Sequence, residues 1–88
     1  MTTREAKIVN SLGLHARPAA AIVKVASGFK ATIEIIRDDM TVNGKSIMGV
    51  MMLAAECGSS IIFRAEGPDE VEALEALVAL VASGFGET

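Results

Sequence analysis

The sequence is poor in the residues that mark several large classes of protein. Its 88 residues include one cysteine, one histidine, three phenylalanines and neither tryptophan nor tyrosine. A single cysteine, Cys57, excludes an internal disulfide. Because it has no histidine or second cysteine at ligand spacing, we expect Cys57 to be a buried structural thiol rather than a metal ligand. Hydrophobic residues make up 51% of the chain, so its core must be built almost entirely from aliphatic side chains.

Long basic or apolar runs are also missing. The net charge is −3, and no basic cluster interleaved with aromatics is present, which argues against nucleic-acid binding. No apolar run reaches the 18 residues of a membrane span, and no charged-then-apolar leader opens the sequence. We therefore expect one domain, 1–88, that is soluble and cytoplasmic, inserts into no membrane and carries neither metal nor cofactor.

Hydrophobic periodicity divides the chain into seven elements. Alternation and β-branched residues predict strands, whereas apolar residues three and four apart predict helices. The expected strands are 4–9, 31–36, 40–42 and 59–67, and the expected helices are 16–27, 46–53 and 67–84. Gly28 would end the first helix with a positive φ. Val71, Leu74, Val78 and Val81 would form the buried stripe of the last one.

This order, β-α-β-β-α-β-α, predicts an α+β fold. The two middle strands are close in sequence, which favours antiparallel pairing between them. We expect one mixed or antiparallel sheet with helices packed on one face. Periodicity alone leaves the order of the strands in the sheet open.

The single histidine, His15, precedes the first predicted helix and allows three interpretations. It could simply cap or end a loop, which is the commonest role of a lone histidine. It could bind a metal, but the sequence offers no cysteine or second histidine as a partner. It could instead do nucleophilic or acid–base chemistry through its imidazole.

The residues after His15 favour the chemical interpretation. A helix that begins at Ala16 leaves its first N–H groups unpaired, and with the positive helix end they form an anion site. Arg17 adds a forked cation suited to phosphate oxygens. Pro18 is tolerated in the first turn, and Gly13 permits a close turn before it. No convincing acid or base is evident near position 15, so we expect partner proteins to supply the remaining catalytic groups.

Two segments carry a family resemblance. "GLHARPAA" (13–20) and "NGKSIMGVMML" (43–53) resemble the signature segments of the histidine-containing phosphocarrier family, HPr, of the bacterial sugar phosphotransferase system. The resemblance implies an open-faced β-sandwich, with a four-stranded antiparallel sheet covered on one face by three helices. It also implies that His15 is phosphorylated, on the ring nitrogen nearer the backbone, by the phosphoenolpyruvate-dependent enzyme I. His15 would then pass the phosphoryl group to a sugar-specific EIIA-type protein, while Arg17 and the backbone of Ala16 and Arg17 hold the phosphate.

The second segment predicts regulation and docking. Ser46 is a good N-cap, and it matches the serine that HPr kinase/phosphorylase phosphorylates in many members of the family. An apolar cluster follows it, made of Ile47, Met48, Met51 and Met52. We expect at least two of these four residues in the core and the others in an exposed docking patch. The predicted docking residues are Ala20, Lys24, Ile47, Met48 and Met51.

Some features leave the cellular role open. Some relatives carry basic residues at positions 27 and 49, where this chain has Ser27 and Gly49, so its basic rim is thinner. The ending "SGFGET" is similar to nitrogen-branch paralogues, whereas "GKSIMGVMML" is closer to kinase-regulated sugar carriers. We expect a monomeric phosphocarrier rather than a free-standing enzyme. The alternative is a nitrogen-branch carrier, or a regulatory module read by transcription factors or kinases.

Overall fold

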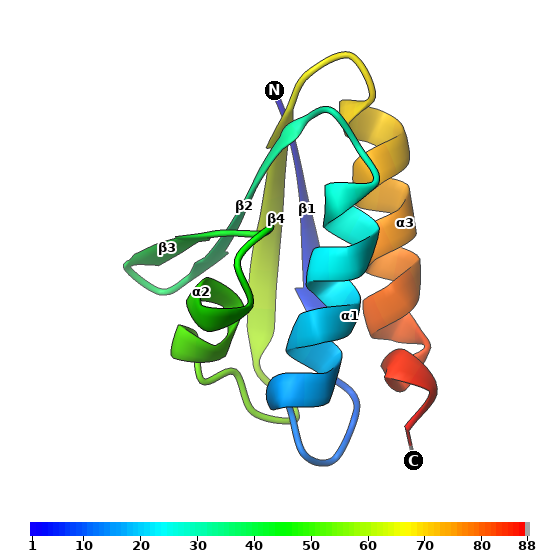
Figure 1. Cartoon of the computed structure of the whole chain (residues 1–88). Coiled ribbons are helices and arrows are strands. Elements are labelled where there is room, and N and C mark those ends of the chain that lie inside the picture. The colour runs from blue at the N-terminus through cyan, green and yellow to red at the C-terminus, as the bar shows by residue number, and fades with distance from the viewer. Residues whose placement is uncertain (88) are drawn as a thin grey trace.

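A computed structural model of the chain describes residues 1–87 and confirms the predicted order of elements (Figure 1). The strand and helix boundaries fall close to the predicted ones, and the first strand begins two residues earlier than expected. The elements are β1 (Thr2–Lys7), α1 (Ala16–Ser27), β2 (Thr32–Arg37), β3 (Met40–Asn43), α2 (Ile47–Met52), β4 (Ser60–Glu66) and α3 (Glu70–Ala82), followed by a 3₁₀ turn (Gly84–Gly86).

The four strands form one antiparallel sheet in the order β1-β4-β2-β3. The longest central strand, β4, pairs with β1 on one side and β2 on the other, and Phe63 lies opposite Arg4 and Ile35. The helices cover one face, with α1 and α3 running antiparallel side by side and α2 beside β3 (Figure 1). The expected open-faced sandwich is therefore confirmed.

The core lies between the sheet and the helices and is almost entirely aliphatic. Alternation in β4 places Ile61, Phe63 and Ala65 in the core, while Ile62 is exposed on the other face. Phe63 is fully buried and is the one aromatic side chain at the centre of the core. Full burial of a side chain of this size contributes roughly 1.5–3 kcal/mol.

The buried face of α3 differs from the predicted stripe. Leu74 and Val81 are buried as expected, but Val71 is exposed and Val78 is only half-buried. Ala73 and Leu77 take their places in the core. The reason is that α3 packs against α1 as well as against β1 and β4, so its buried face is turned towards both layers.

Two further expectations were wrong. Gly28 has a φ of −77°, so α1 ends with an ordinary right-handed residue whose N–H donates to Val25. Cys57 is exposed, with Sγ 3.7 Å from the carbonyl oxygen of Val9. Cys57 lies at the surface, in the turn before β4. Its apolar residue type suggests burial, but its exposure is decided by its place in this turn.

Candidate functional site

The histidine lies at the end of the molecule where three segments meet. The loop after β1 enters the N-terminus of α1 at the same end at which α3 finishes (Figure 1). Since α1 and α3 are antiparallel, residues near position 15 and residues near position 87 become neighbours in space.

Gly13 fixes the path of the loop into the site. Its φ is +67°, and a Cβ atom there would lie 2.4 Å from the carbonyl oxygen of Ala55. The same carbonyl accepts the N–H of Leu14 at 2.9 Å, and the Leu14 side chain is buried. Only glycine combines this conformation with such a close approach, so the predicted close turn at Gly13 is confirmed.

His15 is the N-cap residue of α1, but its side chain does not cap the helix. Its backbone is extended, and its carbonyl accepts the first helical hydrogen bond, from Ala19, at 3.0 Å. Pro18 is buried and has no N–H. The unpaired donors expected in this first turn are therefore those of Ala16 and Arg17, beside the imidazole.

The imidazole instead contacts a carboxylate from the other end of the chain. Nε2 of His15 lies 3.0 Å from Oε2 and 3.2 Å from Oε1 of Glu87. This contradicts our expectation that no acid or base lies near position 15. Sequence reasoning missed Glu87 because 72 positions separate the two residues, and only the antiparallel packing of α1 and α3 brings them together.

Glu87 is supported by a buried amide. Nδ2 of Asn10 donates to Oε1 of Glu87 at 3.0 Å and to the carbonyl of Gly13 at 2.8 Å. Asn10 is only 2% exposed, and its Oδ1 has no hydrogen-bond partner among the described residues. The hydrogen bond from His15, followed by that from Asn10, holds the pKa of Glu87 below its usual range against the opposing effect of burial. The positive charge of Arg17 lowers the pKa of Glu87 further.

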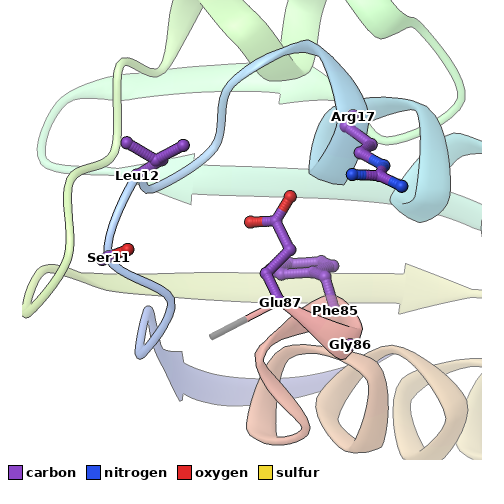
Figure 2. Close-up of a pocket in the computed structure, with 6 residues that line it drawn as sticks. All are labelled: Ser11, Leu12, Arg17, Phe85, Gly86 and Glu87. Atoms are coloured by element: carbon purple, nitrogen blue, oxygen red, sulfur yellow. The ribbon is translucent and has the colours of Figure 1, made fainter.

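A pocket of about 400 Å³ opens between the loop and the 3₁₀ turn. Figure 2 shows the carboxylate of Glu87 between Leu12 on one side and the exposed guanidinium of Arg17 on the other. The lining residues are Ser11, Leu12, Arg17, Phe85, Gly86 and Glu87. The structure thus brings a cation, a carboxylate and the first turn of α1 to one hollow next to His15.

Ser46 begins α2 as its side-chain cap. Its backbone is extended, and Oγ accepts the N–H of Gly49 at 3.1 Å. Ser46 is half-buried. The predicted N-cap is therefore confirmed, and the hydroxyl lies at the surface end of the helix.

The apolar residues of α2 are more exposed than predicted. Ile47, Met48, Met51 and Met52 are all exposed, so the expectation that at least two of them lie in the core was wrong. The α2 region fills the core with Val50 and the following Leu53 instead. On α1, which packs against α2, Ala20 and Lys24 are exposed. All five predicted docking residues are therefore surface residues on two adjoining helices.

Residues 1–87 contain no cluster of three or more histidine, cysteine or acidic side chains placed to hold a metal ion. Within the same range, none of the helices combines the length and apolar character of a membrane span.

Together these features define a class of protein. It is a small open-faced β-sandwich that carries its only histidine at the N-terminus of a helix, beside an arginine. A family profile described as "PTS HPr component phosphorylation site" matches residues 2–83.

Curated and structural relatives agree with this profile. The chain is 48% identical over 87 residues to the phosphocarrier protein HPr of Cupriavidus necator, covering 99% of this chain and 98% of that one. It is 46% identical over 81 residues to the HPr-like protein Crh of Halalkalibacterium halodurans, covering 92% and 96%. A crystal structure of HPr-C-His from Thermoanaerobacter tengcongensis superposes with a TM-score of 0.95 at 48% identity, covering 100% and 99%. The chain belongs to the HPr family of phosphocarrier proteins of the phosphotransferase system.

Proposed function

We propose that His15 accepts a phosphoryl group from phosphorylated enzyme I and passes it to an EIIA-type protein. The observation that carries this proposal is the position of His15, at the N-cap of α1 with Arg17 exposed two residues later. Family membership supports the same role. In this proposal residues 1–88 act as one carrier domain in the cytoplasm.

The transfer step requires little from the carrier itself. The Nδ1 lone pair of His15 attacks phosphorus, the bond from phosphorus to the donor histidine breaks, and its electron pair returns to the donor ring. Onward transfer repeats the exchange, with His15 as the leaving group. The guanidinium of Arg17 and the N–H groups of Ala16 and Arg17 bind the transferring oxygens. The imidazole is partly exposed, with 35% of its side-chain surface accessible, so a partner can reach it.

Ser46 supplies a regulatory site in the same proposal. Its hydroxyl lies at the N-terminus of α2, where a phosphate finds favourable N–H donors and the positive end of the helix. The modifying enzyme would be HPr kinase/phosphorylase. The new charge would stand next to the exposed apolar surface of α2 and oppose docking there.

Partner docking is assigned to the exposed surface shared by α1 and α2. Its residues are Ala20, Lys24, Ile47, Met48 and Met51. Flexible methionine side chains suit a surface that receives partners of different shape, because they can repack against each one. Lys24 adds a positive charge that favours acidic partners.

Whether the protein serves the sugar branch or the nitrogen branch depends on which enzyme I binds this surface. We propose the sugar branch, because Ser46 and the α2 sequence match kinase-regulated sugar carriers. A regulatory role is the second candidate, favoured by the similarity to an HPr-like protein Crh. Dimers are described among the structural relatives, including an HPr dimer of Thermoanaerobacter tengcongensis, and we propose that this chain acts as a monomer.

One experiment tests the assignment directly. The protein is incubated with phosphoenolpyruvate and purified enzyme I of either the sugar or the nitrogen branch, and transfer to EIIA-type acceptors is then measured. We expect acid-labile phosphate on His15 and faster phosphorylation by the sugar-branch enzyme. Faster phosphorylation by the nitrogen-branch enzyme would reassign the branch, and no phosphorylation by either would overturn the carrier function.

A further inference from the structure

We propose that Glu87 is a positioning residue for phosphoryl transfer, which holds the imidazole of His15 as the Nε2–H tautomer and so presents the Nδ1 lone pair to phosphorus. The inference rests on the proposed phosphorylation of His15. It assigns a role to a carboxylate that the signature segments do not contain.

The contact chemistry fixes the tautomer. Both oxygens of Glu87 lie within hydrogen-bond distance of the same ring nitrogen, Nε2. An ionised carboxylate can only accept hydrogen bonds, so Nε2 must carry the proton in this contact. A neutral imidazole protonated at Nε2 has its lone pair at Nδ1. The low pKa of Glu87 keeps its carboxylate ionised near neutral pH.

Glu87 is held in place by two features. The amide of the buried Asn10 donates to its Oε1. The preceding 3₁₀ turn has three successive residues with positive φ, which are 69° at Gly84, 60° at Phe85 and 74° at Gly86. Phe85 adopts this costly conformation for a non-glycine residue while packing against the core. The turn therefore directs the chain back onto the histidine loop.

The arrangement suits the charge that develops during transfer. As Nδ1 attacks phosphorus, the ring gains positive charge and the Nε2–H bond becomes more polar. A carboxylate at Nε2 stabilises that charge from the side of the ring opposite the phosphoryl group. The buried aspartate in Ser-His-Asp triads has the same relation to its histidine. Arg17 binds the phosphoryl oxygens, whereas Glu87 contacts Nε2 of the imidazole. The two charged side chains therefore act on opposite sides of the ring.

A small-molecule phosphoryl donor tests the tautomer without any partner protein. Phosphoramidate transfers its phosphoryl group to imidazole with loss of ammonia, and NMR distinguishes the Nδ1 and Nε2 products. We expect Nδ1-phosphohistidine from the wild type and a mixture of both products from Glu87→Ala. Glu87→Gln retains an acceptor oxygen and should stay mainly at Nδ1. Glu75→Ala, an exposed glutamate on α3, is the matched control and should behave as the wild type.

Transfer from enzyme I tests the consequence for rate. We expect Glu87→Ala to lower kcat about tenfold, as for other residues that orient a reacting group, with the KM for the carrier unchanged. Glu87→Gln should lose less, because it keeps the orientation but not the charge. Identical products and kcat in wild type and Glu87→Ala would overturn the inference. A mixed product from Glu87→Ala, together with no transfer from enzyme I to the wild type, would overturn the proposed function instead and leave the tautomer assignment standing.

Discussion

The hydroxyl oxygen of Ser46 accepts a hydrogen bond from the backbone N–H of Gly49 at 3.1 Å, which makes Ser46 the side-chain cap of α2. The cap matters because α2 is only six residues long and contains a glycine. A helix this short depends on its cap and on tertiary packing, chiefly that of Val50. The proposed regulatory residue is therefore also a structural one.

Substitution of Ser46 should separate these two roles. Ser46→Ala should cost about 1 kcal/mol of unfolding free energy, because the cap is lost, yet keep nearly wild-type affinity for enzyme I. Ser46→Asp should keep a capping oxygen but weaken the apparent affinity, since the added charge must be desolvated on docking. Steady-state phosphorylation at varying carrier concentration measures the apparent affinity, and chemical unfolding measures the free energy of unfolding. Equal affinity for all three proteins would remove Ser46 as a docking switch.

His15→Ala should abolish phosphorylation by enzyme I without unfolding the domain. The ring of His15 makes no helix cap, and it lies outside the aliphatic core. Acid-labile, base-stable phosphate should be present in the wild type alone, and thermal unfolding of the variant should remain cooperative. Retention of that phosphate in His15→Ala would contradict the assignment of the carrier residue.

Arg17→Ala should slow phosphoryl transfer in both directions. Arg17 is exposed and lines the pocket beside Glu87. Removal of its side chain should therefore change the free energy of unfolding by no more than about 0.5 kcal/mol. Arg17→Lys should restore only part of the rate, because an ammonium group lacks the forked geometry that matches phosphate oxygens. Rapid-quench measurement of transfer from enzyme I and to the EIIA-type acceptor tests this. Unchanged rates in Arg17→Ala would make Arg17 a solvated surface residue.

Met48→Asp should weaken docking and leave the fold intact. The side chain of Met48 is 73% exposed, so the substitution removes no core contact. Truncation of an important interface residue costs more than about 1 kcal/mol, equivalent to roughly fivefold in affinity. The matched control is Val71→Asp, on the exposed side of α3. Isothermal titration with unphosphorylated enzyme I should show the loss for Met48→Asp alone, and equal losses for both variants would argue against a docking surface on α2.

Asp69 should make the stability of the domain depend on pH. Its carboxylate accepts the backbone N–H of Lys30 at 2.8 Å and that of Ala31 at 2.8 Å. These bonds, that of Lys30 first, lower the pKa of Asp69 below its value of 3.8 in an unstructured chain. A lowered folded-state pKa stabilises the protein above the unfolded value, and the stabilisation is lost as the pH falls through the folded value.

The variant Asp69→Asn isolates this contribution. Chemical unfolding should show the wild type losing stability on acidification from pH 5 to pH 2, with a weaker loss in Asp69→Asn. Glu75→Gln is the control, since Glu75 is exposed on the same helix. The same acid dependence in wild type and Asp69→Asn would show that the two backbone bonds do not stabilise the charged form.

The site was only partly accessible to sequence reasoning. Gly13, His15, Arg17 and Ser46 can be proposed from the sequence because turn and cap signals are local, and each depends on residues a few positions away. Glu87 was not found, because its contact with His15 spans 72 positions and has no periodic signature. Cys57 was misjudged for a related reason, since its residue type suggests burial while its place in a surface turn decides its exposure.

The sequence by itself determined the order of the elements and their approximate boundaries. Alternating and helical periodicity reflect backbone geometry, which acts within each segment. Tertiary structure alone decided the strand order β1-β4-β2-β3, the exposure of Val71 and of the methionines of α2, and the contact of His15 with Glu87. All three features depend on which surfaces pack together. A segment with apolar residues on several faces could bury any one of those faces, and only the neighbouring elements select which face is buried.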